Sequence, residues 1–312
     1  MTGGLSNTGG VSNPNVIRIV EVGPRDGLQN ESKRVPTGIR VALVDALTAA
    51  GLPAIEVGAF VSPSWVPQMA ESDVVLREIE QRPGVRYPVL VPNIKGYDAA
   101  LRAGAREVSI FAAATEAFSE ANINCSIAES LDRFRPVAAA ARDAGIALRG
   151  YVSCVLGCPY QGAVPVGDVV RVARQLADLG CYEISLGDTI GVGTAMQARE
   201  MVTAVAQDIG IERVALHFHD TYGQALANVL ACLDLGVRVV DASVAGLGGC
   251  PYAKGAAGNL ATEDLVYMLN GIGITTGVDL DELLAAGQGI SQFLGKPHTS
   301  KVAQAMAAKR KA

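Results

Sequence analysis

The chain has 312 residues, of which 49% are hydrophobic and 18% charged, and its formal net charge is −5. Such a length fits one α/β barrel or two average domains, and the acidic balance argues against a nucleic-acid partner, which calls for a basic patch. No apolar run reaches the roughly 18 residues of a membrane-spanning helix, so we expect no membrane partner either.

The first fifteen residues, MTGGLSNTGGVSNPN, carry no positive side chain and no apolar core. They match neither a secretory signal nor an Arg-rich transit peptide, and we predict a disordered tail over 1–15. Six cysteines are scattered along the rest of the chain. Without a secretory leader, this usage favours a reduced, cytoplasmic protein.

From residue 16 onwards, short β-branched runs alternate with helix-like segments. The eight runs are 16–22, 54–58, 87–92, 107–113, 147–153, 182–187, 213–219 and 238–246. Segments such as 38–51 and 166–180 have apolar positions at helical spacing and end at a glycine. Eight strand–helix repeats predict a parallel (β/α)8 TIM barrel with extra C-terminal helices, as a single domain over 16–312. A doubly wound open sheet is the alternative, although its glycine fingerprint is missing from the first turn, GPRDGLQN.

Unusual polar residues fall at the carboxyl ends of these runs, where a barrel places its active site. They include Arg25, Asp26, Glu56, Asn93, Arg149, Ser153, Asp188, His217, His219 and Asp220, and Cys250 lies in the glycine-rich loop that follows the last run. A charged side chain inside a strand needs a partner when it is buried. These positions are therefore the candidate functional residues.

Two of the three histidines form the sequence LHFHD at 216–220. Since side chains alternate along a strand, His217 and His219 share a face. With a carboxylate they make a metal site, and Asp26 is the candidate because strand 1 closes the barrel next to strand 8. Oxygen ligands mixed with imidazole suit Mg²⁺ or Mn²⁺. The alternative is a pair of core histidines bonded to backbone.

Six stretches of the chain together resemble the hydroxymethylglutaryl-CoA lyase family, within the metal-dependent TIM-barrel lyases and Claisen-type synthases. They are VEVGPRDGLQNE (20–31), FVSPSWVPQM (60–69), GYVSCVLGCPY (150–160), YEISLGDTIGVGT (182–194), HFHDTYGQALAN (217–228) and the stretch 243–269 with its GLGGCPY loop. The resemblance covers roughly residues 16 to 306. It implies cleavage of 3-hydroxy-3-methylglutaryl-CoA to acetoacetate and acetyl-CoA, a divalent cation and a homodimer.

The resemblance also implies site residues. The metal ligands of the family match Asp26, His217, His219 and Asn259, the last of which has helix N-cap as its alternative role. Other active-site positions match Arg25, Glu56, Arg149, Ser185, Asp188 and Cys250. We expect catalytic roles for Cys250, Arg25, His217, Asp26, Glu56 and Asp188, and substrate contacts from Arg25, Gln29, Arg149, Ser185 and Asn93.

The glycine-rich loop 244–259 suggests a lid that brings Cys250 over the substrate as an acid/base group. The residues leave the general base open. Two other functions also remain: a related barrel synthase acting on a 2-oxo acid, and a non-catalytic metal-binding barrel. Leucine degradation is one pathway that fits, and the residues do not separate it from others.

Overall fold

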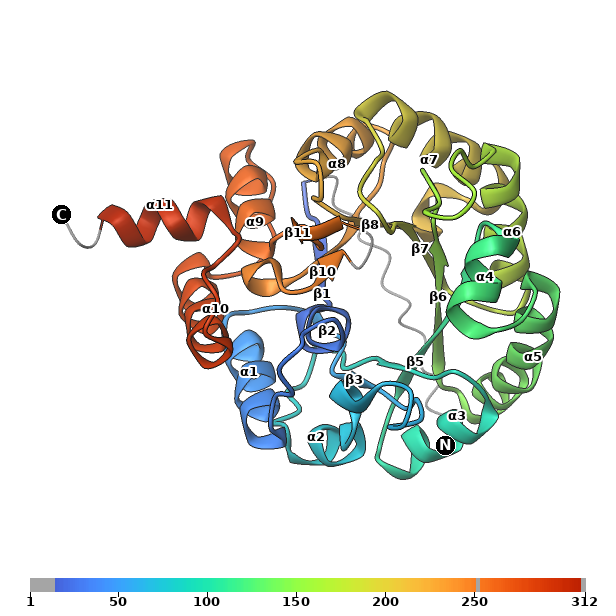
Figure 1. Cartoon of the computed structure of the whole chain (residues 1–312), viewed down its shortest axis with the longest axis horizontal. Helices are drawn as coiled ribbons and strands as arrows, with labels where there is room; N and C mark the ends of the chain where they lie inside the picture. The colour runs from blue at the N-terminus through green and yellow to red at the C-terminus, as the bar shows by residue number, and fades with distance from the viewer. Residues whose placement is uncertain (1–14, 251–252, 310–312) are drawn as a thin grey trace, which may run out of the picture.

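Parallel strands form a closed ring in the computed structural model, which describes residues 15–250 and 253–309 (Figure 1). The strands are β1 (Arg18–Glu21), β2 (Ala54–Ile55), β3 (Gly58–Ala59), β4 (Val89–Leu90), β5 (Glu107–Ala113), β6 (Ala147–Ser153), β7 (Glu183–Asp188), β8 (Val214–Phe218) and β9 (Val239–Ala242). Their order is β2-β1-β9-β8-β7-β6-β5-β4-β3. Because β2 and β3 are two halves of one predicted strand, the ring closes, and the predicted (β/α)8 fold class is confirmed. The predicted tail falls outside the described residues, except for Asn15.

Each predicted run holds a strand, but several strands are shorter than predicted. Prolines at 88 and 92 flank β4 and lack the N–H that would extend its ladder. The run 54–58 divides at Glu56, where β2 pairs with β1 and β3 pairs with β4. The run 238–246 stops at Ala242, because the chain turns into η4 (Val244–Gly246) with Ala245 in the left-handed region at φ 58°.

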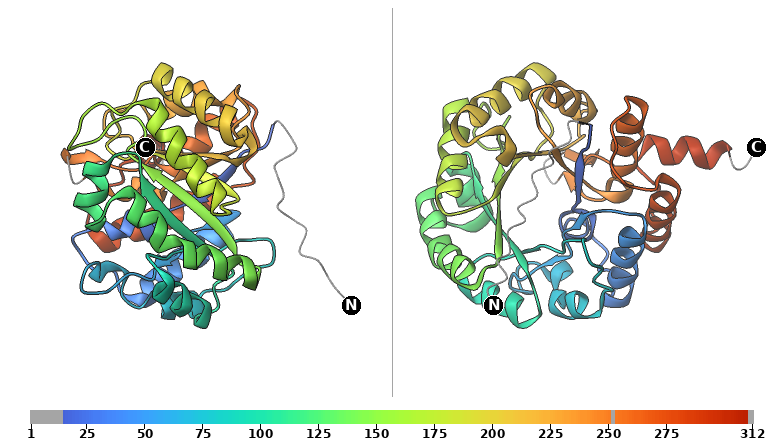
Figure 2. Two further views of the ribbon diagram at one scale, coloured as in Figure 1. Left: turned by 90° about the vertical axis from the view of Figure 1, so that its right-hand side faces the viewer. Right: turned by 180° about the vertical axis from the view of Figure 1, so that it is seen from behind.

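Helices surround the strands in an outer ring, as Figures 1 and 2 show from the front, the side and behind. They are α1 (Thr37–Ala49), α2 (Ser72–Glu78), α3 (Ile94–Arg102), α5 (Ile127–Ala144), α6 (Val166–Asp178), α7 (Ala195–Ile209), α8 (Ala225–Leu233) and α9 (Thr262–Gly271), with short turns η2 (Pro67–Met69) and η3 (Ile211–Arg213). Three helices are additional: α4 (Glu116–Ile123) after β5, α10 (Leu280–Leu294) against α1, and α11 (Lys301–Lys309). The extra C-terminal helices are thereby confirmed.

Local sequence explains where these helices begin and end. Ser126 and Glu129 form a reciprocal capping box at the start of α5, and Gly145 ends that helix at φ 66°. The apolar helix faces pack on the strands in one continuous core that includes Val44, Phe134 and Leu216. Across the described residues, every helix is too short or too polar to cross a bilayer.

Candidate active site

A cavity of about 610 Å³ opens at the carboxyl ends of the barrel strands. Its polar walls come from the loops after β1, β3, β4 and β5 and from the last residues of β6 to β8. Among the residues that line it are Arg25, Asp26, Gln29, Asn30, Ser62, Trp65, Asn93, Asn122, Arg133, Tyr151, Ser153, Thr189, His217 and His219. The cavity therefore lies where the fold predicts the active site.

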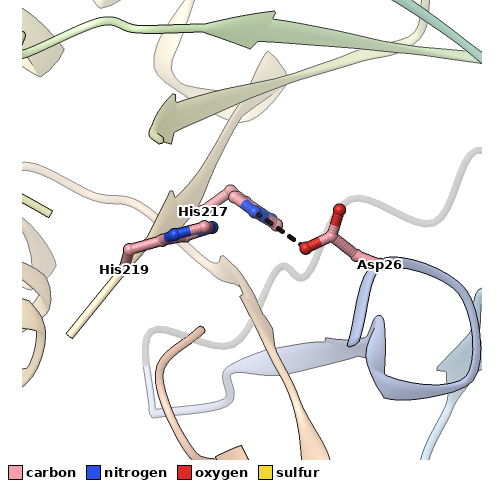
Figure 3. A group of neighbouring side chains, drawn as sticks. All are labelled: Asp26, His217 and His219. Carbon is pink, nitrogen blue, oxygen red and sulfur yellow. Dashed lines mark ion pairs between the residues drawn. The ribbon is translucent and has the colours of Figure 1, made fainter. Parts of the chain in front are cut away.

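Asp26, His217 and His219, which all line this cavity, lie close together in Figure 3. Asp26 lies in the helical turn η1 (Gly23–Gly27) that directly follows β1, whereas His217 lies in β8 and His219 immediately after it. One ligand atom from each residue lies within 4.8 Å of the others. Because side chains alternate along a strand, His217 and His219 share a face, and both imidazoles point toward Asp26.

The charges of these groups suit a cation. Burial alone raises the pKa of Asp26. The nearby charge of Arg25 opposes this most strongly, and the pKa falls to about 2 with further contributions from His217, His219 and a hydrogen bond from Asn259. Burial, reinforced by His217 and opposed by Asp26, lowers the pKa of His219 to about 4, so this imidazole is neutral at pH 7. Its Nδ1 is buried and accepts no hydrogen bond from any described residue. A carboxylate beside a neutral imidazole with an unpartnered nitrogen fits a divalent metal ion.

Asn259 joins this group through the backbone and the side chain. It pairs with His219 in an isolated β-bridge and is 3% exposed. Its Nδ2 donates to Asp26 Oδ2 at 2.8 Å and to the Leu247 carbonyl at 3.2 Å, which leaves the amide oxygen for a cation. The predicted alternative, a helix N-cap, is wrong, because α9 begins after Ala261 and no cap bond from Asn259 is found.

A polar layer beneath the cavity fixes His217. Its Nδ1 lies 3.3 Å from Asp241 Oδ2, so its Nε2 faces Asp26 Oδ2 at 4.0 Å. Asp241 also accepts hydrogen bonds from both terminal nitrogens of Arg149, at 3.1 and 2.7 Å, and from the hydroxyl of Ser185 at 2.8 Å. Burial raises the pKa of Asp241, yet Arg149 and His217 bring it down to about 2. This carboxylate therefore holds the imidazole in one orientation.

Arg25 is held by two carboxylates. Its Nε donates to Glu56 at 2.5 Å and its Nη1 to Asp26 at 2.7 Å. The guanidinium also lies 5.4 Å from the ring centre of Tyr151, on the cavity wall. Burial raises the pKa of Glu56, and the adjacent guanidinium opposes that rise. Such a restrained cation is suited to an oxygen that gains negative charge.

The turn that carries Arg25 and Asp26 packs closely against η4. A side chain at Gly27 would approach Leu247 Cβ to 2.7 Å, so only glycine fits there. The same contact brings the turn after β1 beside the root of the glycine-rich loop. Within that loop, β10 (Gly249–Cys250) and β11 (Ala253–Ala257) form an antiparallel pair. The predicted role of Cys250 concerns its side chain, which lies outside the part of the chain described in detail.

Five other predicted residues lie outside the group formed by Asp26, His217, His219 and Arg25. Gln29 and Asn93 line the cavity, although the Asn93 oxygen accepts from the Gly96 N–H as the cap of α3. Arg149 and Ser185 lie in the layer below and bond to Asp241. Asp188 is fully buried and accepts from the N–H groups of Gly193 and Val192, so it braces the loop after β7. Burial raises the pKa of Asp188.

Two residues at the site were not predicted. Asp241 pairs in register with His217 across β8 and β9, and a charged residue inside a strand-like run was the signal for it. Tyr151 follows Arg149 by two positions on β6, and its ring centre lies 5.4 Å from the guanidinium group of Arg25 and 4.8 Å from that of Arg149. Its position on the same strand face was the corresponding signal.

Comparison with known proteins gives close relatives over nearly the whole chain. The model of the HMGL-like family matches residues 16–290. Rat mitochondrial hydroxymethylglutaryl-CoA lyase is 61% identical over 292 residues, which are 94% of this chain and 90% of the relative. A Pseudomonas aeruginosa protein, named 3-hydroxy-3-isohexenylglutaryl-CoA/hydroxy-methylglutaryl-CoA lyase, is 60% identical over 296 residues, 95% of this chain and 99% of its own.

Solved structures agree with these matches. Hydroxymethylglutaryl-CoA lyase from P. aeruginosa superposes with a TM-score of 0.93 at 60% identity, covering 95% of this chain and 99% of that one. An HMG-CoA lyase from Acinetobacter baumannii, solved in complex with coenzyme A and 3-methylmalate, gives 0.89 at 36% identity, covering 94% and 95%. The predicted family is thus confirmed, and the chain belongs to the HMGL-like family.

Proposed function

We propose that the protein is a lyase that cleaves 3-hydroxy-3-methylglutaryl-CoA to acetoacetate and acetyl-CoA. The observation that carries this proposal is the convergence of Asp26, His217 and His219 in the wall of a cavity that Arg25 also lines. The relatives that share the whole barrel carry the same activity in their names. A related synthase is the alternative that the experiment below separates.

Asp26, His217, His219 and the amide oxygen of Asn259 would hold a divalent cation, Mg²⁺ or Mn²⁺. Such an ion supplies Lewis acidity and a template for the oxygens of the substrate. Asp241 keeps the Nε2 of His217 directed at that place, since it engages Nδ1 at 3.3 Å. This second layer supports the proposed ligands as hydrogen-bonded carboxylates do in other metal sites.

The reaction is a retro-Claisen cleavage, in which the C3 hydroxyl loses a proton and the C2–C3 bond breaks. Negative charge then develops on the thioester oxygen as the enolate of acetyl-CoA forms. We assign Arg25 to that oxygen, because Glu56 and Asp26 fix its guanidinium at the cavity wall before substrate arrives. Glu56 acts as a positioning residue. Asp188, buried against loop backbone, braces the pocket and does not line the cavity.

We assign Cys250 as the donor of the proton that the enolate carbon takes up when acetyl-CoA forms. The assignment rests on its place in β10, in the loop that follows the η4 turn next to Arg25 and Asp26. A loop that closes over the cavity excludes water from the reactive enolate. A thiol that arrives with the loop supplies the proton only once the site is closed.

The polar wall of the cavity offers a binding surface for the coenzyme A part of the substrate. The A. baumannii relative was solved with coenzyme A, and we infer acyl-CoA binding here from that likeness. Gln29 and Asn93 line the cavity near η1 and α3, and Arg133 on α5 adds a cation at its rim. Arg133 is the cavity-lining cation that we assign to the phosphate groups.

A longer acyl branch is a second candidate substrate. The P. aeruginosa relative is named for 3-hydroxy-3-isohexenylglutaryl-CoA as well as hydroxymethylglutaryl-CoA. The cavity has an apolar wall that includes Val61, Leu90, Phe111 and Val152. This surface would stabilise an isoprenoid branch at about 25 cal/mol per Å² of apolar area.

Further parts of the proposal concern the state of the protein. We propose a homodimer and one domain over 16–312. The five cysteines whose side chains are described, Cys125, Cys154, Cys158, Cys181 and Cys232, are free thiols, which supports a reducing compartment such as the cytoplasm. Among the relatives, some are mitochondrial and others are bacterial.

Acetoacetate release from 3-hydroxy-3-methylglutaryl-CoA is the test, measured with Mg²⁺ and again after chelation. We expect release with metal and none without it. The isohexenyl substrate is assayed in parallel, and its kcat/KM relative to the methyl substrate decides between the two acyl groups. Absence of release from either substrate, together with acetyl-CoA-dependent condensation on a 2-oxo acid, would replace the lyase with the synthase.

A further inference from the structure

The short turn η4, which follows β9, has a backbone conformation that its own sequence does not favour. Ala245 in this turn has left-handed angles, φ 58° and ψ 9°, and is 3% exposed. These angles bring the Cβ of any residue other than glycine close to a carbonyl oxygen, which costs free energy. Alanine therefore keeps this conformation only because neighbouring parts of the chain hold it there.

Both backbone polar groups of Ala245 are bound by residues outside the turn. Its N–H donates to the two carboxyl oxygens of Glu263, at 2.9 and 3.0 Å. Its carbonyl accepts hydrogen bonds from the Thr299 hydroxyl at 2.8 Å and from the Thr299 N–H at 3.2 Å. A side chain at Gly246 would collide with the same hydroxyl, so Thr299 lies directly on the turn. Glu263 on α9 and Thr299, between α10 and α11, thus hold Ala245 together.

The start of α11 fixes the place of Thr299. The next residue, Ser300, is fully buried and donates from Oγ to Asp264 at 2.6 Å. Asp264, on α9, also accepts from the N–H groups of Lys301 at 3.1 Å and Val302 at 2.9 Å. The three helices α9, α10 and α11 lie together on one side of the barrel (Figure 1). The Thr299 hydroxyl is therefore presented to the turn by a segment that is itself anchored.

The residue after the turn connects it to the proposed metal site. The Leu247 carbonyl accepts from Asn259 Nδ2 at 3.2 Å and from Ser243 Oγ at 2.8 Å. Asn259 Nδ2 donates in addition to Asp26 Oδ2 at 2.8 Å. These two acceptors together set the direction of the amide group, and so the direction of its oxygen. A shift of the Leu247 carbonyl would remove one of them.

We propose that Thr299 is a positioning residue for the reaction, acting on the metal site through Asn259. By holding the Ala245 carbonyl, Thr299 fixes the turn and the Leu247 carbonyl that follows it. That carbonyl then keeps the Asn259 amide oxygen free for the cation. Thr299 does not line the cavity, so it acts without touching the substrate. The inference rests on the proposed function, because it assumes the metal site assigned above.

The test compares three variants of the full chain. T299V keeps the branched shape of the side chain and removes its hydroxyl, whereas T299S keeps the hydroxyl. The matched control is T203V, because the Thr203 hydroxyl likewise donates to a backbone carbonyl, that of Arg199 at 2.7 Å, on α7 in the outer ring. Calorimetric titration gives the Kd for Mn²⁺ of each protein. Acetoacetate release is measured at limiting and at saturating Mn²⁺.

We expect the Kd for Mn²⁺ to be about fivefold weaker in T299V, which corresponds to about 1 kcal/mol, the net contribution of one neutral hydrogen bond. T299S and T203V should stay within about twofold of the unaltered protein, since each keeps the hydrogen bond from residue 299. Loss of the hydroxyl lowers the population of the binding-competent turn, and saturating metal restores that population. Acetoacetate release by T299V should therefore fall at limiting Mn²⁺ and recover at saturating Mn²⁺.

The outcomes separate this inference from the proposed function. Equal Mn²⁺ affinity in T299V and the unaltered protein would overturn the positioning role and leave the lyase in place. An equal loss of affinity in T203V would also overturn it, because the effect would then follow overall stability. Absence of acetoacetate release from the unaltered protein, with the weaker Mn²⁺ binding of T299V still observed, would contradict the lyase and support the positioning role.

Discussion

Replacement of Asp241 by asparagine removes one charge from the layer that supports His217. The carboxylate accepts two hydrogen bonds from Arg149, one from Ser185, and faces His217 Nδ1 at 3.3 Å. Asparagine keeps the shape and one acceptor oxygen but neither the charge nor the second acceptor. The Arg149 guanidinium, 1% exposed, then keeps only Glu183 as a counter-ion.

The expected cost follows from this geometry. Breaking a buried ion pair by removing one partner costs about 3–5 kcal/mol, and we take about 3 kcal/mol because Glu183 continues to neutralise Arg149. At about 2 °C per kcal/mol for a chain of this size, the Tm falls by about 6 °C. Loss of a carboxylate behind a ligand histidine also weakens metal binding by about 10- to 100-fold.

Calorimetric titration of Mn²⁺ and thermal unfolding measure the two effects separately. S185A is the matched control, since it removes one hydrogen bond to the same Asp241 oxygen and leaves every charge in place. We expect S185A to bind Mn²⁺ within about threefold of the unaltered protein, because the charged carboxylate that lies behind His217 Nδ1 stays in place. Equal metal affinity in D241N and the unaltered protein would refute this account of His217.

Three further predictions address the cavity and its lid. H219A should lose Mn²⁺ affinity by more than about a hundredfold, with loss of acetoacetate release, and retained affinity in the same titration would contradict its place in the site. C250S should lower kcat by about 10²- to 10⁴-fold with little change in KM, and an unchanged kcat would exclude the proton-transfer role. Trp65, the single tryptophan, is 83% exposed on the cavity wall, so coenzyme A should shift its fluorescence emission to shorter wavelength. An emission spectrum that stays constant at saturating ligand would place the bound molecule elsewhere.

The fold was predictable because its signals are local and repeat. Short apolar runs alternate with helical periods along the chain, several helices end at a glycine, and each such unit adds support to the same barrel. The strand ends were less predictable, and proline explains one of them, at β4. The predicted strand 54–58 divides at Glu56 because β2 pairs with β1 and β3 pairs with β4. The sequence of one strand does not reveal how its two neighbours pair with it.

The metal group was predictable for a geometric reason, since residues two apart share a strand face. The direction in which the Asp188 side chain points was not predictable. Its side chain turns into the loop that contains Gly193, and that contact depends on backbone positions fixed by tertiary packing. Asp241 was missed for a similar reason, because its partner Arg149 is 92 residues away in sequence and lies on a strand separated from β9 by β7 and β8.

Two buried carboxyl groups behind the η4 turn give the protein a distinctive pH dependence. Glu263 is fully buried and accepts the Ala245 N–H at 2.9 and 3.0 Å. Burial, with Glu21 and Asp264 nearby, raises the pKa of Glu263 to about 8, although its backbone hydrogen bonds oppose the rise. Burial likewise raises the pKa of Glu21 to about 7. Both groups therefore retain protons in the native state that the unfolded chain releases near pH 4.5.

Because the native pKa of Glu263 lies above the unfolded value, its contribution to stability is fully present below about pH 4.5 and is lost as pH rises to about 8. E263Q is neutral throughout and keeps an oxygen for the Ala245 N–H. Urea unfolding between pH 5 and 8 should thus show a decline in stability that is shallower in E263Q, by up to about 1.4 kcal/mol per pH unit. His298 Nδ1 lies 3.9 Å from Glu263. Equal slopes in the two proteins would mean that Glu263 is ionised and His298 carries the proton.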